Sequence, residues 1–306
     1  MADSSIPSPA PSPSDATSRE PTAPAKQPSA VAAGLTAPWR AVAALLLGLA
    51  AVNLPFSLVA TMLMTDPPVS PGMLLRSLVL FSVLPALCGR AILRIFRASV
   101  ARADGGIRIE RPGLAVHVPC AAIEGAMPWR IPAPGPGLSL RLRSGARLAT
   151  GLRTDAPDEI LDLLAAGGVD TSAAREHPTI VYQRERARRG RRGPVRLLVK
   201  YLGFGALPAA VFFNAHQYIA YGGTLGQYYL YGLGPYLETA TIYWGLTATF
   251  LVLYASVWRG LAEIASLLAA WLTPTHAATA RRISERACTL LYYGGVPLLV
   301  VYRFLP

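Results

Sequence analysis

The sequence predicts a multi-span α-helical membrane protein that carries a small β-rich cytoplasmic domain between two groups of membrane helices. Two compositional observations support the membrane assignment: 52% of the 306 residues are hydrophobic and only 15% are charged, whereas soluble domains contain about 25% charged residues. The third observation is a central stretch, residues 98–178, in which short apolar runs alternate with polar residues. That period of two is typical of half-buried β-strands.

The N-terminal segment differs in composition from the rest of the chain. Residues 1–37 are rich in Pro, Ser and Ala and contain no aromatic residue. A segment of this kind buries too little apolar area to offset the entropy lost on ordering. We therefore expect residues 1–37 to form a disordered tail.

Long apolar runs predict the membrane-spanning helices. The first run, residues 41–64, contains no charged residue and is long enough, at ~1.5 Å per residue, to cross the ~30 Å hydrocarbon core. Further runs lie at residues 73–96, 197–221, 239–258 and 288–301. We therefore expect a two-span hairpin in residues 38–97 and about three spans in residues 197–306. Residues 259–272 either continue the fourth helix or lie along the membrane interface.

Arginine is distributed unevenly over the connections between these runs. Residues 184–196 are rich in Arg, whereas residues 65–72 and 214–238 contain none. Because Arg-rich connections remain in the cytoplasm, we place the N-terminus and residues 98–196 there and the C-terminus in the periplasm. The preference for Arg over Lys, with abundant Ala, Gly and Pro, indicates a bacterial protein, so the expected location is the bacterial inner membrane.

The middle domain is expected to contain several β-hairpins and one helix. Leu138 and Leu140 alternate with Ser139 and Arg141, and Gly-Gly and Ser-Gly pairs stand where tight turns would fall. A Pro and two acidic residues favour a helix that begins near Asp155.

This order of elements resembles a bacterial pleckstrin-homology-like (PH-like) domain. The resemblance is carried by the hairpin at 103–118, the stretch Val-Pro-Cys-Ala-Ala-Ile-Glu-Gly-Ala at 118–126, the hairpin at 138–152 and the helix from Asp155. Two spans, such a domain and further spans also follow one another in bacterial membrane proteins of this kind. The resemblance implies a fold for the middle domain rather than an activity.

Motifs for catalysis, metal binding or cofactor binding are not evident in the sequence. The four histidines, His117, His177, His216 and His276, are far apart, and the cysteines form no close pair. Nor does a phosphate-binding loop, a His-Glu-x-x-His pair or a nucleophile elbow occur. We therefore predict no catalytic residue, no metal and no cofactor.

The segment 214–243 combines many Tyr residues with a few polar ones and is expected to form an outer loop between the third and fourth spans. Its candidate site residues are Asn214, His216, Gln217 and Glu238, because these polar groups could converge at the outer membrane surface and bind an ion or a headgroup. The alternative is an aromatic belt at the membrane interface, where Tyr is ordinarily enriched.

Arginines beside the spans are candidate contacts for anionic lipid headgroups. They lie at the end of the second span and in an Arg-rich linker, residues 179–196, and they are Arg90, Arg94, Arg97, Arg184, Arg186, Arg188, Arg189, Arg191 and Arg192. Each basic residue close to an anionic leaflet contributes about 1 kcal/mol. The alternative is a purely topological role, in which these residues only hold the ends of the spans in the cytoplasm.

These observations favour a non-enzymatic inner-membrane protein whose cytoplasmic PH-like domain binds lipid headgroups or a protein partner, in a scaffold or assembly role. A transporter or channel-like component that uses the outer loop is the alternative, and a membrane enzyme is the third hypothesis. Anionic membrane lipids are the expected partners, with another membrane protein as the second class. Nucleic acid is not expected despite the net charge of +12, because the excess positive charge lies beside hydrophobic segments.

Overall fold

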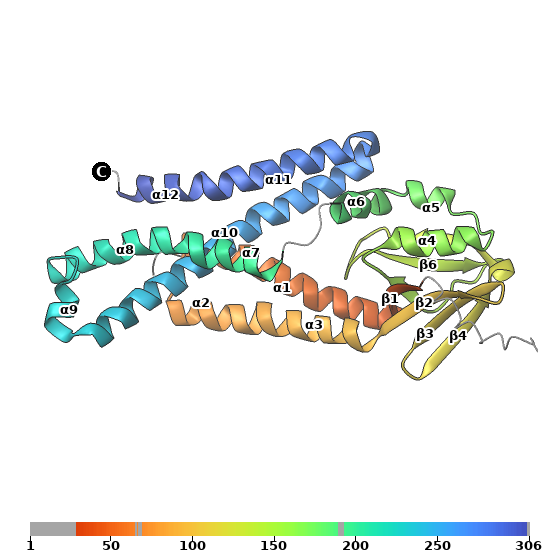
Figure 1. The fold of residues 1–306 in the computed structure, drawn as a ribbon, viewed down its shortest axis with the longest axis horizontal. Coiled ribbons are helices and arrows are strands. Elements are labelled where there is room, and N and C mark those ends of the chain that lie inside the picture. Colours follow the sequence, from red (N-terminus) through yellow and green to blue (C-terminus); the bar gives the residue numbers. More distant parts are fainter. Residues whose placement is uncertain (1–28, 65, 67–68, 189–192, 305–306) are drawn as a thin grey trace, which may run out of the picture.

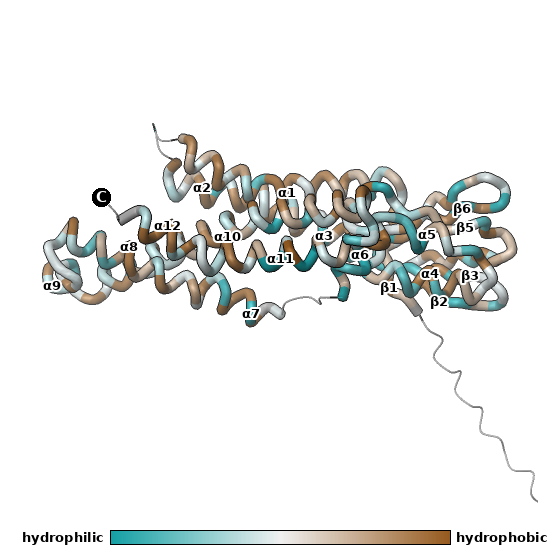
Figure 2. Tube along the Cα trace, turned by 90° about the horizontal axis from the view of Figure 1, so that it is seen from above, coloured by the Kyte–Doolittle hydropathy of each residue, from teal (hydrophilic) through white to brown (hydrophobic). Residues whose placement is uncertain are grey.

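The structure is a computed structural model that describes residues 29–64, 66, 69–188 and 193–304. The predicted tail up to residue 28 and the linker residues Arg189, Arg191 and Arg192 lie outside the described residues. A β-rich domain forms one end of the molecule, and long helices extend away from it (Figure 1). Hydrophobic residues dominate these helices, while hydrophilic residues gather in and next to the β-rich domain (Figure 2).

Within the described residues, four helices are long and apolar enough to cross a membrane. They are α1 (Ala37–Leu63); α2 (Pro71–Leu78), continued through a π-helical turn (Val79–Val83) into α3 (Leu84–Ile95); α7 (Pro194–Leu198), continued through a second π-helical turn (Val199–Gly203) into α8 (Phe204–Tyr221); and α10 (Leu233–Leu272). They correspond to the first four predicted spans. The fifth predicted span, residues 288–301, divides between α11 (Ala277–Tyr293) and α12 (Gly295–Phe304), which are not among these four.

The helix α10 contains both the fourth predicted span and residues 259–272. Its 40 residues correspond to about 60 Å at ~1.5 Å per residue, which is twice the ~30 Å hydrocarbon thickness. Residues 259–272 therefore continue the fourth helix, the first of the two predicted alternatives. α11 and α12 run back alongside α10, so the C-terminus lies at the end of the helices that is far from the sheet (Figure 1).

The β-rich domain contains a seven-stranded antiparallel sheet in the order β4-β3-β2-β1-β7-β6-β5. The strands are β1 (Ser29–Leu35), β2 (Arg97–Ala103), β3 (Gly106–Arg111), β4 (Leu114–Pro119), β5 (Ile123–Pro128), β6 (Gly137–Leu142) and β7 (Gly151–Arg153). The turn between β2 and β3 consists of Asp104 and Gly105, both with positive φ, as a two-residue hairpin turn of this type requires.

The central strand β1 corrects the predicted boundary of the disordered tail. It lies between β2 and β7, with Ala32 opposite Ala98 and Gly34 opposite Leu152. Five of its seven residues are Ser, Ala or Gly, which have weak strand propensity, and the sequence pattern therefore did not reveal it. As a result, the α1–α3 hairpin is inserted between two neighbouring strands, β1 and β2, and the β-rich domain is discontinuous in sequence.

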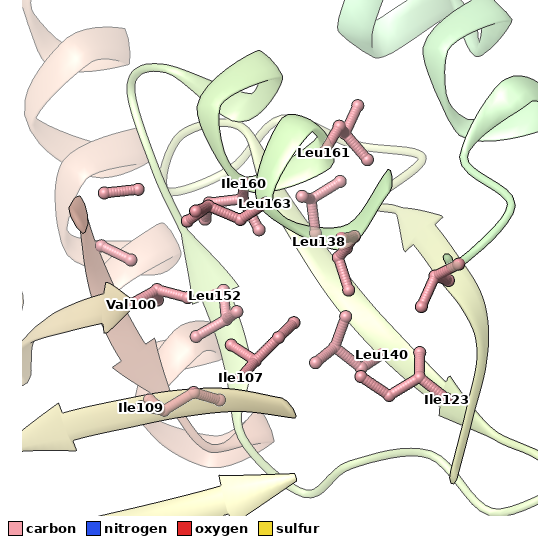
Figure 3. Packing of buried hydrophobic residues seen from close by; sticks show 14 of the residues in the cluster. Val100, Ile107, Ile109, Ile123, Leu138, Leu140, Leu152, Ile160, Leu161 and Leu163 are labelled. Atoms are coloured by element: carbon pink, nitrogen blue, oxygen red, sulfur yellow. The ribbon is translucent and has the colours of Figure 1, made fainter. Parts of the chain in front are cut away.

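The core of the domain lies between the sheet and α4 (Pro157–Ala166), as Figure 3 shows. Its fully buried side chains come from both layers and include Val100, Ile107, Leu138, Leu140, Leu152, Ile160 and Leu161. Leu140 is buried and the neighbouring Arg141 is exposed, which confirms the predicted alternation in this strand. Thr154 connects the start of α4 to β1, because its hydroxyl donates to the carbonyl oxygen of Val31 at 3.2 Å.

The predicted linker begins later than expected, because its first half forms α6 (Pro178–Ala187), which follows α5 (Ser172–Glu176). Ile180 of α6 is only 1% exposed and belongs to the domain core. His177 caps the helix through its ring nitrogen Nδ1, which accepts a hydrogen bond from the backbone N–H of Thr179 at 3.3 Å. α6 is thus an integral part of the β-rich domain and not a linker.

Candidate anion-binding pocket

A cavity of about 940 Å³ lies where the first membrane helix meets the β-rich domain. Ala37, Arg40, Ala41 and Ala44 of α1 line one side. The end of β5, the segment 129–133 that follows it and α5 line the others. Because α1 enters the membrane from this point, the pocket lies at the expected level of the membrane surface.

The ionisable side chains that line the pocket are all basic. Arg40, Arg130, Arg147 and His177 contribute to the lining, and none of the lining residues is Asp or Glu. These four side chains come from four separate segments of the chain, and only the fold brings them together. A concave site lined by one sign of charge attracts ligands of the opposite sign, so the pocket is suited to an anion.

Trp129 organises one wall of the pocket. Its side chain is 7% exposed, and its indole N–H donates to the hydroxyl of Ser139 at 3.0 Å. The ring packs directly on the backbone of Gly137 and Gly151, where an added Cβ would come within 2.7 and 2.8 Å of it. The guanidinium carbon of Arg40 lies 4.7 Å from the ring centroid, a cation–π contact that holds this arginine against the wall.

His177, another lining residue, is held in place by contacts with Thr179 and Trp271. Its Nδ1 accepts from the N–H of Thr179, so the neutral ring carries its proton on Nε2. The ring also makes an edge contact with Trp271 near the end of α10, with 5.5 Å between centroids. Burial lowers the pKa of His177, and the nearby charge of Arg130 lowers it further. At neutral pH the residue is therefore an uncharged hydrogen-bond donor rather than a fourth cation.

The structure does not bring the predicted outer cluster together. His216 contacts the rings of Tyr221 and Tyr243, and Asn214 and Glu238 are exposed. No hydrogen bond or ion pair joins Glu238 to His216, both of which lie in the described part of the chain. The predicted outer loop is also mostly helical: residues 214–221 end α8, α9 (Gly226–Tyr231) follows, and α10 begins at Leu233.

Gln217, the fourth predicted residue, belongs to a different polar network. It is fully buried, and its side-chain Nε2 donates to Oε1 of Gln227 at 2.8 Å. Gln227 in turn donates from Nε2 to the hydroxyl of Thr239 at 2.9 Å and to the carbonyl oxygen of Pro235 at 3.2 Å. Sequence reasoning missed Gln227 and Thr239, although a second Gln in an apolar stretch was a usable signal.

The predicted headgroup contacts divide into two groups. Three of them are exposed at the end of α3 and its junction with β2, where lipid headgroups could reach them: Arg90, Arg94 and Arg97. Arg184 is instead engaged within the domain, because its Nη2 and Nε bind the two carboxylate oxygens of Asp158 at 2.7 and 3.0 Å. The remaining two described arginines lie nearby on the surface: Arg186 is exposed, and Arg188 pairs with Glu185 at 2.6 Å.

A buried ionic network connects the β-rich domain to the helices, and the sequence did not predict it. Arg281 of α11 binds Glu263 of α10 through two hydrogen bonds and Glu285 through Nε at 2.8 Å. Tyr182 of α6 donates its hydroxyl to the same carboxylate of Glu263. Arg259, four residues before Glu263 on α10, lies farther from this carboxylate, with 3.7 Å between Nη2 and Oε1.

Comparison of the chain with protein-family models, with curated proteins and with solved structures finds no match. The functional argument therefore rests on the geometry of the pocket.

Proposed function

We propose that this is a bacterial inner-membrane protein whose PH-like β-rich domain binds anionic lipid headgroups in the pocket at the start of α1. The observation that carries the proposal is the lining of the pocket, which places Arg40, Arg130 and Arg147 around one cavity without a carboxylate. A phosphate group would receive charge-assisted hydrogen bonds from these arginines and a neutral hydrogen bond from Nε2 of His177.

The location of the pocket supports a lipid over a soluble anion. Ala37, Ala41 and Ala44 form the α1 side of the cavity, and α1 is one of the four helices that can cross a membrane. A ligand whose phosphate contacts Arg40 would have its apolar part beside the small residues of α1. The exposed arginines at the end of α3 would attract the same anionic leaflet.

The PH-like assignment is supported by the seven antiparallel strands and by the helix that covers their core. The Arg-rich stretch before the third span favours a cytoplasmic position for this domain and a periplasmic C-terminus. In that orientation the pocket faces the cytoplasmic leaflet. The transporter alternative, which uses the Tyr-rich outer loop, gains no support from two candidate residues of that loop, because no hydrogen bond or ion pair joins Glu238 to His216 in the described residues.

Lipid binding by the full-length protein in mild detergent tests the proposal. Native mass spectrometry would compare phosphatidylglycerol, which is anionic, with zwitterionic phosphatidylcholine. We expect retention of phosphatidylglycerol and about a fivefold loss of affinity for Arg40→Gln or Arg130→Gln, since each basic residue contributes about 1 kcal/mol. Arg102→Gln is the matched control, because Arg102 is exposed on β2 and does not line the pocket. Equal losses of affinity for phosphatidylglycerol in all three variants would contradict specific binding of the lipid in the pocket.

A further inference from the structure

The segment that connects α8 and α10, at the end of the molecule farthest from the sheet (Figure 1), contains no charged residue. We call residues 218–237 the tip; they comprise the last turn of α8, the short helix α9 and the first residues of α10. Between Tyr201 and Trp258 the only charged residue is Glu238, directly after the tip. A hydrated loop outside a membrane ordinarily contains charged residues, so this composition requires another explanation.

The side chains that the tip presents to its surroundings are large and apolar or aromatic. Ile219 is 87% exposed, Tyr229 76%, Leu230 65% and Tyr231 64%. Contiguous exposed apolar surface of this kind marks a contact with a membrane or a partner. Tyr is the residue type that is enriched where the hydrocarbon core meets the headgroups, because its ring is apolar and its hydroxyl is polar.

Two glutamine side chains, Gln227 of the tip and Gln217 directly before it, are directed inward. Gln217 and Gln227 are buried and bind each other, and Gln227 also binds the hydroxyl of Thr239 and the carbonyl oxygen of Pro235. All four polar atoms of the two side-chain amides therefore have a protein partner. Hydrogen bonds within the protein are necessary where water is scarce, because an amide without a hydrogen-bond partner in an apolar environment costs several kcal/mol.

Helix length places the tip at a defined depth. Arg259 is the first charged residue of α10 on the side of the β-rich domain, and a charged side chain at this end marks the headgroup region. A hydrocarbon core of ~30 Å takes about 20 residues of helix, which extends from Arg259 to Thr239. Glu238 and the tip then lie at the level of the opposite headgroups.

We infer that the tip is embedded in the boundary between headgroups and acyl chains of the leaflet opposite the β-rich domain, and that lipids of that leaflet cover Ile219 and the tyrosines of α9. The tip anchors the α8–α10 pair at the far side of the membrane. The buried Gln217–Gln227 pair holds α9 across the ends of α8 and α10, so that its exposed tyrosines face the lipid.

Depth measurement by electron paramagnetic resonance tests this inference in the full-length protein. The three natural cysteines, at 88, 120 and 288, are replaced by Ala, and a nitroxide is attached at Tyr229→Cys or, in a second variant, at Ile219→Cys. Power saturation compares collisions of the label with oxygen, which partitions into lipid, and with a water-soluble nickel complex. Leu45→Cys, 73% exposed in the first half of α1, and Ser144→Cys, in an exposed turn of the β-rich domain, serve as lipid and water references.

The expected result is an oxygen-to-nickel collision ratio at positions 229 and 219 that lies clearly above the value at position 144 and below that at position 45. Ratios at both positions equal to that at position 144 would show a hydrated tip and overturn the inference. Ratios equal to that at position 45 would place the tip in the hydrocarbon core and overturn it as well. The outcome does not depend on lipid binding in the pocket, because the labelled positions lie at the other end of the molecule.

Discussion

Arg281 and Glu263 form a two-point ion pair between α11 and α10, with Nη1 2.8 Å from Oε2 and Nη2 3.1 Å from Oε1. The Arg281 side chain is only 7% exposed. Because Tyr182 of α6 donates to the same carboxylate, one buried group joins the β-rich domain to both helices. This junction, together with the insertion of the α1–α3 hairpin into the sheet, ties the domain firmly to the membrane region.

Arg281→Ala should destabilise the protein strongly, by about 3 kcal/mol, because it leaves Glu263 partly buried without its main counter-charge. Thermal unfolding of the detergent-solubilised protein measures the effect. Arg282→Ala is the matched control: it removes the same charge from the next residue, which is exposed. Similar shifts in Tm for the two variants would show that the ion pair contributes no more than a surface charge.

Tyr182 predicts a loss of stability at high pH. Burial, together with the hydrogen bond to Glu263, raises the pKa of Tyr182 to about 12, from about 10 for an unperturbed Tyr. The unfolded chain therefore releases this proton first, and the stabilisation that is complete below pH ~10 is lost as the pH rises toward 12. Between pH 9 and pH 11, the Tm of the Tyr182→Phe variant should fall less than the Tm of the wild type. Identical changes in the two proteins would contradict this assignment.

Asp158 predicts the opposite dependence at low pH. Its hydrogen bonds from Arg184 hold the pKa of the Asp158 carboxyl below its usual value, so its contribution is present above pH ~4 and is lost as the pH falls further. Both side chains are about one-third exposed, and the pair should contribute no more than about 1 kcal/mol. Asp158→Asn should therefore lower Tm slightly at pH 7 and by a smaller amount at pH 3. A decrease in Tm at pH 3 as large as the decrease at pH 7 would show that altered packing, and not loss of the ion pair, destabilises the variant.

The central position of β1 in the sheet predicts how the isolated β-rich domain unfolds. A fragment of residues 97–187 lacks the strand between β2 and β7 and should not unfold cooperatively, as monitored by circular dichroism. Fusion of residues 29–35 to its N-terminus through a short Gly-Ser connection should restore cooperative melting, because Ala33 is paired with Arg97 and the ends to be joined are adjacent. Cooperative melting of both fragments at the same temperature would show that β1 is dispensable.

Composition and periodicity were sufficient to predict much of the fold. Apolar runs predict the four long helices, and the alternation of Leu138 and Leu140 with polar residues predicts the buried face of β6. They were insufficient for β1, because a run of Ala, Val and Gly beside a Pro-rich tail has no distinctive period. Its place in the sheet depends on pairing with Leu152 and Ala98, which are far away in sequence.

The functional residues were harder to predict, because contacts between segments that are far apart in the sequence determine which side chains come together. His216 packs on Tyr243, five residues after Glu238 on the same helix, and five residues at ~100° each turn the helix by about 140°. Glu238 and Tyr243 therefore lie on different faces of α10, and His216 of α8 contacts the face that carries Tyr243. Arg40 and Trp129 form one wall of the pocket, although neither the start of a membrane helix nor a Pro-rich segment indicates a binding site by itself.

Photo-crosslinking tests the central claim, lipid binding in the pocket, most directly. Full-length protein in vesicles would be irradiated with a phosphatidylglycerol probe that carries a diazirine in its headgroup, and the labelled peptides would be mapped by mass spectrometry. We predict labelling of residues 37–44 and 126–133, reduced severalfold by Arg40→Gln and unchanged by Arg102→Gln. Labelling confined to the end of α3 around Arg90 and Arg94, with the pocket segments unlabelled, would contradict the proposed function.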